Sequence, residues 1–252
     1  MNISENKHRY LVHLAFDGTN YHGWQKQPNA PTIQETIEDA LCKITKQEII
    51  LIGCGRTDTG VHARKFFAHF DCDSFHTPQE LSQLTYKLNG FLDEDIVIFS
   101  ISKVDNSVHS RFSPIKREYK YYIITSKDPF KYNYAYKITV PLDVEKMNAA
   151  AKLLIGSKDF QSFSKVNTQV NNFICTVFEA YFTKTDNEIV FTISANRFLR
   201  NMVRAIVGSL IDVGLSKCSI DDFNQIIESK DRCSAGLSVP AKGLFLNDVV
   251  FE

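Results

Sequence analysis

The chain has 252 residues, of which 44% are hydrophobic, and its 29 Lys and Arg residues balance 29 Asp and Glu residues to a formal net charge of zero. This length suits one large domain or two small ones, and neutrality excludes a uniformly basic nucleic-acid binder but not a local basic groove. No apolar run approaches the roughly 18–20 residues of a membrane span, and residues 1–9 lack the apolar core of a signal peptide. We therefore expect a cytoplasmic protein with no membrane partner.

The six cysteines and seven histidines are scattered along the sequence. They form no C-x-x-C pair and no H-x-x-x-H pair. This spacing is typical of buried reduced thiols, so we expect neither a disulfide framework nor a metal site.

The first hundred residues show alternating strand and helix signals. Two capping boxes, Thr32 to Glu35 and Thr77 to Glu80, each predict the start of a helix. Alternating or short apolar runs predict strands at residues 10–16, 49–52, 66–70 and 96–99. The resulting β-α-β-β-α-β order favours helices packed on a mainly antiparallel sheet.

The polar residues 104–112 suggest a boundary between an N-terminal half, residues 1–105, and a C-terminal half, residues 106–252. Strands are predicted in the second half at residues 119–125, 174–183, 188–194 and 244–251. Helices are predicted after Asp143 and at residues 198–213 and 219–228. We expect an α+β fold of two similar halves, although no strong residue-level repeat supports a duplication.

A glycine-rich turn at residues 53–63 follows the predicted strand at 49–52. It contains three glycines within eight residues, one carboxylate, Asp58, and a nearby cation, Arg56. Asp58 could cap its own backbone in an ordinary surface turn, or it could be a catalytic carboxylate. The turn by itself does not decide between them.

Two other segments offer rings and polar groups. Residues 21–28 contain the sole tryptophan, Trp24, beside Gln25. They form either a loop pinned by the half-buried indole ring or a contact surface for a ligand. Residues 111–122 interleave rings such as Tyr119 with Arg111, Lys116 and Arg117. This second pattern suits RNA, but it is also that of an ordinary tyrosine-rich strand.

Arginines are clustered at the start of the predicted helix 198–213. Arg197, Arg200 and Arg204 have the spacing of one helical face. Cations near a helix N-terminus oppose the helix dipole, so a bound anion or a partner carboxylate is the better explanation for them. Pairing with Asp58 would keep that carboxylate ionised.

These motifs occur in the order found in the TruA-type tRNA pseudouridine synthase family. Residues 55–63 resemble G-R-T-D-A-G-V-H-A, with Thr59 in place of the usual Ala, and residues 109–113 resemble H-A-R-F-S, with Ser110 in place of Ala. Four further segments resemble Y-D-G-T-x-Y-x-G-W-Q, R-x-Y-x-Y, F-x-x-x-M-V-R-x-x-x-G and G-L-x-L, namely residues 16–25, 117–121, 198–208 and 243–246. The resemblance covers nearly the whole chain and implies a pseudouridine synthase fold with a central, positively lined cleft.

The resemblance also implies an activity: isomerisation of uridine to pseudouridine at positions 38, 39 and 40 in the anticodon stem-loop of tRNA. It implies no cofactor, and a homodimer with one tRNA across both subunits. Asp58 would be catalytic, Tyr119 would pack on the target uracil, Arg204 would pair with Asp58, and Arg56 would position the flipped nucleotide. Further RNA contacts would come from Arg111, Lys116, Arg117, Arg200, Trp24 and Gln25. Attack at C1′, attack on the uracil ring and a glycal route all remain open.

Two other functions compete with this interpretation. Residues 58–60 read D-T-G, as in aspartic proteases, but those enzymes need two carboxylates. No second D-T-G or D-S-G occurs here, so only a symmetric dimer of the retropepsin type could supply both. Alternatively, the chain could be a non-catalytic RNA-binding module in which Asp58 is dispensable.

Overall fold

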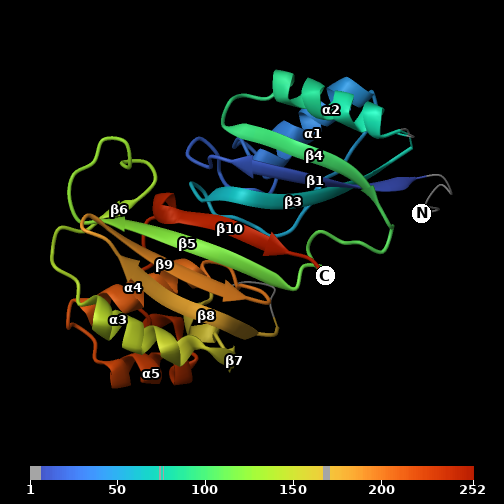
Figure 1. Cartoon of the computed structure of the whole chain (residues 1–252). Coiled ribbons are helices and arrows are strands. Elements are labelled where there is room, and N and C mark those ends of the chain that lie inside the picture. The colour runs from blue at the N-terminus through green and yellow to red at the C-terminus, as the bar shows by residue number, and fades with distance from the viewer. Residues whose placement is uncertain (1–6, 74, 76, 167–170) are drawn as a thin grey trace. The chain divides into compact units, whose positions relative to one another are not determined.

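The computed structural model describes residues 7–73, 75, 77–166 and 171–252, and Figure 1 shows the whole chain. The chain forms two compact units. Unit 1 comprises Met1–Ile115 with Asp248–Glu252, and unit 2 comprises Lys116–Asn247.

Unit 1 is built on a central strand, β1 (His8–Phe16), with antiparallel neighbours on both sides. These neighbours are β3 (His62–Cys72) and β4 (Ile96–Val104), and the two-residue β2 (Ile52–Gly53) pairs with β3. Alternate residues of β1 are buried, as its sequence pattern predicts: Tyr10, Val12, Leu14 and Phe16.

Two helices complete unit 1, α1 (Ile33–Thr45) and α2 (Pro78–Phe91), and both begin where the capping residues predict. The Thr77 box of α2 has both of its reciprocal hydrogen bonds. At α1 the Thr32 side chain accepts from the Glu35 amide, while the Glu35 carboxylate lies 3.3 Å from Lys26 Nζ. The Thr32 cap of α1 is therefore present, and the Glu35 side chain pairs with Lys26.

The strand predicted at residues 49–52 is largely wrong, because only Ile52 belongs to a strand. Side chains of α1 bind this backbone in place of a neighbouring strand. The Leu51 amide donates to Glu38 Oε1 at 2.8 Å, and Gln34 Nε2 donates to the Leu51 carbonyl at 3.0 Å. The segment is apolar because every second side chain, at Ile49 and Leu51, is buried.

The polar residues after β4 belong to unit 1, so the division at Ile115 comes ten residues later than the boundary predicted after residue 105. Arg9 Nη1 donates to the carbonyls of Asn106 and Val108. The Ser110 amide and hydroxyl both lie within hydrogen-bonding distance of the buried His69 Nδ1, at 3.2 and 2.8 Å. A polar segment thus forms an anchored loop here.

Unit 2 contains an antiparallel run of four strands in the order β5, β9, β8, β7. Their bounds are Lys116–Ile124, Glu188–Ala195, Ile174–Lys184 and Gly156–Asp159. The short β6 (Tyr136–Lys137) pairs with β5 in parallel. In the last strand, β10 (Leu244–Val250), residues up to Asn247 belong to unit 2 and later ones to unit 1.

The helices of unit 2 pack together in Figure 1 as α3 (Val144–Ala151), α4 (Met202–Gly214) and α5 (Ile220–Ser229). Asp143 caps α3 as predicted, and Ser219, the first residue of the predicted helix 219–228, is the N-cap of α5. Single 3-10 turns occur at Lys152–Leu154, Gln161–Phe163, Arg232–Ser234 and Ala241–Gly243. These elements and the sheet confirm the predicted α+β class with mainly antiparallel pairing.

Helix α4 begins four residues later than predicted, which changes the arginine cluster. Its N-cap, Asn201, has a φ of 67° in the left-handed region, so the helix cannot extend back through it. Arg197 and Arg200 therefore precede the helix, and only Arg204 lies within it. The prediction that the three arginines share one helical face was wrong.

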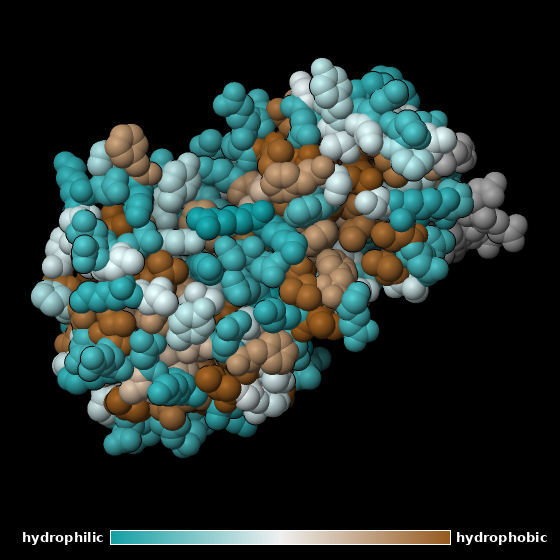
Figure 2. Space-filling view, viewed as in Figure 1, coloured by the Kyte–Doolittle hydropathy of each residue, from teal (hydrophilic) through white to brown (hydrophobic). Residues whose placement is uncertain are grey.

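Figure 2 shows hydrophilic side chains over most of the visible surface, with hydrophobic ones distributed among them. Within the described residues, none of the helices combines the length and apolar character that a membrane span requires.

Candidate active site

The Asp58 turn has a defined geometry in unit 1. The Asp58 carbonyl accepts a hydrogen bond from the Val61 amide at 3.1 Å, and Gly60 between them has a φ of 76°. This arrangement matches a type II β-turn, whose third residue needs a positive φ and is therefore usually glycine. Asp58 is half-buried and Arg56 is exposed. The turn thus holds a partly shielded carboxylate on a fixed backbone.

The loop at residues 16–25 packs directly against this turn. The Trp24 amide donates to the Thr57 carbonyl at 3.4 Å, and the Gly60 amide donates to the Tyr21 carbonyl at 3.3 Å. A Cβ built on Gly23, whose φ is 88°, would collide with the Thr57 carbonyl. Two motifs about 35 residues apart in the sequence are therefore one structural unit, with a glycine at their contact.

Trp24 shapes this loop from inside. Its side chain is 3% exposed and stacks on Phe66, with ring centroids 4.2 Å apart. A Cβ at Gly53 would collide with the same indole ring, which explains the first glycine of the turn. The structure thus favours the pinned-loop interpretation for Trp24, whereas Gln25 beside it is exposed.

Two polar residues that the sequence patterns do not single out, Tyr21 and His62, support the site. The buried Tyr21 donates through its hydroxyl to Asp95 Oδ1 at 2.8 Å, and burial, reinforced by that carboxylate, raises the pKa of the phenol. His62 Nδ1 lies 3.1 Å from the Gly18 amide and 3.0 Å from Asp17 Oδ1. Both lie within the matched motifs, and their roles depend on partners that spacing does not show.

One side chain beside Asp58 retains unused hydrogen-bonding capacity. Thr57 Oγ1 is buried and has no hydrogen-bond partner among the described atoms. A hydroxyl in this state can donate to a bound ligand or a water molecule without first breaking an internal bond.

In unit 2, Tyr119 and Arg204 are held by different elements. Tyr119 lies on β5, pairs with Ile193 of β9, and packs edge-on against Phe198 at a centroid distance of 5.1 Å. Arg204 Nε donates to the Val239 carbonyl at 2.8 Å, and the Val239 amide donates back to the Arg204 carbonyl at 3.2 Å. The chain near Val239 thus fixes the arginine from outside its own helix.

The segment around Val239 can pack against α4 because residue 208 is a glycine. A Cβ at Gly208 would collide with the Leu237 carbonyl, so the close contact requires glycine at that position. Asn201 Nδ2 also donates to Ser238 Oγ at 2.6 Å. The M-V-R-x-x-x-G spacing therefore has a physical basis: the glycine accommodates the segment that anchors Arg204.

The other predicted RNA-binding cations differ in accessibility. Arg117 is 8% exposed and donates through Nη1 to the Asn196 carbonyl at 2.8 Å, so it cross-links β5 to the end of β9. Lys116 Nζ lies 3.9 Å from Glu179. Arg111 and Arg200 are exposed, and the Arg111 guanidinium lies 5.7 Å from the centre of the Phe112 ring.

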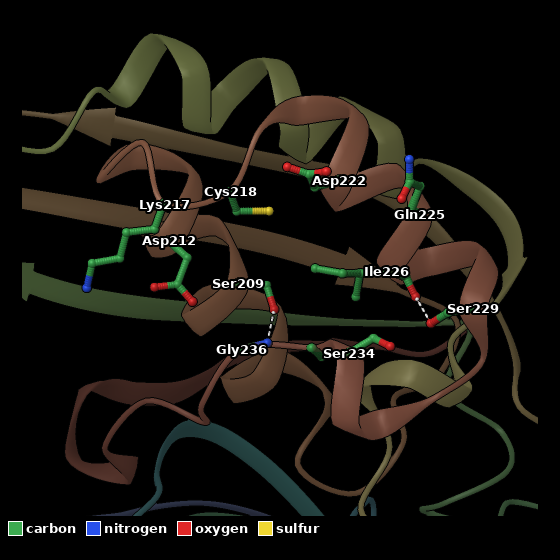
Figure 3. Close-up of a pocket in the computed structure, with 11 residues that line it drawn as sticks. Ser209, Asp212, Lys217, Cys218, Asp222, Gln225, Ile226, Ser229, Ser234 and Gly236 are labelled. Atoms are coloured by element: carbon green, nitrogen blue, oxygen red, sulfur yellow. Dashed lines mark hydrogen bonds between the residues drawn. The ribbon is translucent and has the colours of Figure 1, made fainter.

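A hollow of about 550 Å³ in unit 2 is shown in Figure 3, between α4, α5 and residues 234–236. Asp212, Cys218 and Asp222 are among its lining residues, and none of the predicted site residues is. Within the described residues, no group of three or more potential ligands is arranged to hold a metal ion.

A family model described as tRNA pseudouridine synthase matches residues 13–113 and 150–252. The chain belongs to the tRNA pseudouridine synthase family. It is 48% identical to the tRNA pseudouridine synthase A of Bacteroides fragilis over 244 residues, covering 96% of each chain. It is 48% identical to that of Porphyromonas gingivalis over 247 residues, covering 96% of this chain and 97% of the relative. A Thermoanaerobacter tRNA pseudouridine synthase A is 42% identical over 243 residues, with coverages of 96% and 98%.

These matches confirm the resemblance drawn from the motifs and the enzyme class, an isomerase of the pseudouridine synthase type. The D-T-G sequence at residues 58–60 is therefore part of a synthase turn and gives no support to a protease.

Proposed function

We propose that this protein isomerises uridine to pseudouridine at positions 38, 39 and 40 in the anticodon stem-loop of tRNA. Relatives that span almost the same length carry the name tRNA pseudouridine synthase A, which supports tRNA as the substrate. In the reaction the N1–C1′ bond breaks and the C5–C1′ bond forms, while C5 loses a proton and N1 gains one. Atoms and electrons balance within the nucleotide, so no cofactor is needed.

Asp58 is the catalytic residue in this proposal. The observation that carries it is the single carboxylate held by a type II turn, with Gly60 inside the turn and Gly23 packed against it. A fixed, partly shielded carboxylate suits covalent attack or proton abstraction, since both need one geometry relative to the nucleotide. Attack at C1′, attack on the uracil ring and a glycal route use this same group.

Three residues assist Asp58 in the proposal. Tyr119 packs on the target uracil, and its edge-on contact with Phe198 holds the ring in one orientation. Arg204 pairs with Asp58, and the exposed Arg56 positions the flipped nucleotide. The N-terminal half thus supplies the carboxylate and the C-terminal half supplies the substrate-binding tyrosine and arginine, with a positively lined cleft for the RNA.

Exposed groups are the better RNA contacts. Arg111, Arg200 and Gln25 are exposed and can contact phosphates or bases, with Lys116 as a half-buried addition. Burial of Trp24 and Arg117 limits them to supporting roles. We also propose a cytoplasmic homodimer that places one tRNA across two subunits, which would let a chain of zero net charge form a basic surface.

Mapping of pseudouridine in a tRNA transcript tests the proposal. We incubate transcripts carrying uridine at positions 38, 39 and 40 with wild type or Asp58→Asn, and then map pseudouridine along the whole molecule. The proposal predicts product at these positions with wild type alone. Product elsewhere would overturn the positional assignment, and binding without any product would favour a non-catalytic RNA-binding module.

A further inference from the structure

A loop in unit 2, residues 125–135 between β5 and β6, presents an unusual number of rings to solvent. Phe130 is 88% exposed, Tyr132 is 70% exposed and Tyr134 is 40% exposed. Figure 1 shows the segment projecting past the end of β5, and Figure 2 shows a hydrophobic side chain among hydrophilic ones at that place. Single exposed rings are common in proteins, but three within five residues are typical of a contact surface.

Local hydrogen bonds give this loop a defined shape. The Phe130 amide donates to Asp128 Oδ1 at 2.9 Å, and the Tyr134 amide donates to the Lys131 carbonyl at 3.0 Å. Lys131 Nζ pairs with Glu188 of β9 at 2.6 Å. The rings are therefore carried on an ordered backbone, which lowers the entropy lost when they bind a partner.

The 3-10 turn Ala241–Gly243 and the start of β10 also anchor the loop. Lys242 Nζ donates to the Tyr132 carbonyl at 2.7 Å and lies 4.2 Å from the centre of the Tyr132 ring. The rings of Tyr134 and Phe245 are 6.4 Å apart between centroids. Because Tyr132 remains 70% exposed despite the lysine, the contact orients the ring without covering it.

Charge favours a polyanion as the partner of this surface. Residues 126–137 contain three lysines, Lys127, Lys131 and Lys137, against one carboxylate, Asp128, in a chain whose net charge is zero, and Lys131 is already paired with Glu188. Lys127 and Lys137 are exposed. Rings interleaved with cations suit unpaired nucleotides, whose bases stack on the rings while their phosphates meet the lysines.

We propose that the loop at residues 125–135, together with Lys137 of β6, is an additional RNA-contact surface. It stacks unpaired bases of the substrate on Phe130 and Tyr132. The proposal rests on the proposed function, because it takes the substrate RNA as the partner. Tyr119 and Thr125 are six residues apart along an extended segment, which corresponds to roughly 20 Å. The loop therefore contacts nucleotides other than the one isomerised, and it acts in RNA binding rather than in bond breaking.

A double variant, Phe130→Ala with Tyr132→Ala, tests the stacking. Full-length tRNA transcript labelled with a fluorophore is titrated with protein, and anisotropy gives Kd. Loss of base stacking should raise Kd at least about fivefold, since one stacked base contributes on the order of 1–3 kcal/mol. The matched control is Tyr86→Ala, which removes an 82% exposed ring from α2 and should leave Kd unchanged. Phe130→Leu keeps an apolar side chain without a ring, and we expect it also to weaken binding.

A second pair of variants, Lys127→Ala with Lys137→Ala, tests the phosphate contacts. Each neutralised contact should lower the slope of log Kd against log salt concentration by about 0.7 to 0.9. The aromatic variants should leave that slope unchanged, because stacking releases no counterions.

Unchanged Kd in the aromatic variants, with pseudouridine still formed by wild type, would overturn this inference and leave the proposed function intact. A shift in the oligomeric state measured by sedimentation, without any change in Kd, would also overturn it and assign the loop to a protein contact. Absence of pseudouridine in all wild-type reactions would instead count against the proposed function itself.

Discussion

The Asp58 turn in unit 1 and the Arg204 segment in unit 2 fix their functional side chains in different ways. The turn is defined by missing side chains, since Gly23 and Gly60 allow backbones to meet where a Cβ would collide or a positive φ is needed. Arg204 is defined by a side chain that reaches a carbonyl of a distant segment, at Val239. Added atoms should therefore damage the first region, whereas the second, which also needs Gly208 for its contact with Leu237, should be damaged by removed atoms as well.

The largest expected effect comes from adding one methyl group beside the turn. Gly23→Ala would collide with the Thr57 carbonyl at a residue whose φ is 88°. We expect kcat to fall at least about 100-fold, because displacements near 1 Å have such effects, with about 1–3 kcal/mol lost in stability. Rates are measured from the pseudouridine formed in a tRNA transcript, and stability by urea unfolding.

The control for this change is Gly90→Ala in α2, where an added Cβ meets nothing within 4 Å. It should keep full activity and gain up to about 1 kcal/mol of stability, since alanine favours helices. Activity of Gly23→Ala within twofold of wild type would contradict the view that backbone packing fixes Asp58.

Removing atoms from Arg204 should have the next largest effect. Arg204→Ala loses the Nε bond to the Val239 carbonyl and a charge, and we expect kcat/KM to fall about 10- to 100-fold, as for hydrogen bonds to charged groups. If the guanidinium pairs with Asp58, the acid limb of the pH–rate profile also moves to higher pH. Arg204→Lys keeps the charge and should lose activity without moving that limb; an unmoved limb in Arg204→Ala would separate the arginine from Asp58.

A smaller effect is expected at Tyr119. Tyr119→Phe keeps the ring that packs against Phe198, so kcat should fall less than about tenfold if packing is its function. Steady-state kinetics on a tRNA transcript measure the change. A drop of about 100-fold or more would show that the hydroxyl transfers a proton, since general acid–base groups contribute on that scale.

The smallest effect concerns stability, and it also distinguishes the units. All seven histidines lie before residue 110, so residues 116–247 contain none. Burial lowers the pKa of His69 to about 4 from its ordinary 6.5, and burial also lowers the pKa of His13 and of His109. The unfolded chain then binds more protons than the folded one between about pH 6.5 and 4, so stability is lost as the pH falls through this range.

Hydrogen exchange as a function of pH measures this difference. Amides of β1 and β3 should lose protection between pH 6.5 and 4 before those of β8 and β9 do. His69→Gln should reduce the loss in unit 1 without abolishing it, because His13 and His109 titrate in the same direction. The Asp71 carboxyl, whose pKa is lowered mainly by its hydrogen bond to Arg9, contributes only below about pH 4. Equal loss of protection in both units would contradict this assignment.

Much of the fold was predictable because its signals are local. The Thr77 box, the alternation of β1 and the cap at Asp143 each depend on neighbouring residues, and the structure has all three. Residues 49–52 were misjudged because Glu38 and Gln34 satisfy their backbone, which no apolar pattern reveals. Helix α4 was extended too far because periodicity cannot show that Asn201 adopts a left-handed conformation.

The site was predictable in its residues and less so in their surroundings. The motif around Asp58 identified the turn, yet the packing of Gly23 and Trp24 against it joins distant segments. The residue types of Trp24 and Arg117 suit RNA contacts. Their side chains are only 3% and 8% exposed, however, and this burial depends on tertiary neighbours. Composition could not separate exposed groups from supporting ones.

The most direct test of the central claim, that the Asp58 carboxylate performs the chemistry, compares Asp58→Asn with wild type under single-turnover conditions. Excess enzyme is mixed with a labelled tRNA transcript, and bound RNA and pseudouridine are measured in the same samples. The amide keeps the shape of the side chain, so we predict tRNA binding within about threefold of wild type and a rate at least about 1000-fold lower. Pseudouridine formation by Asp58→Asn at a rate near that of wild type would contradict the account.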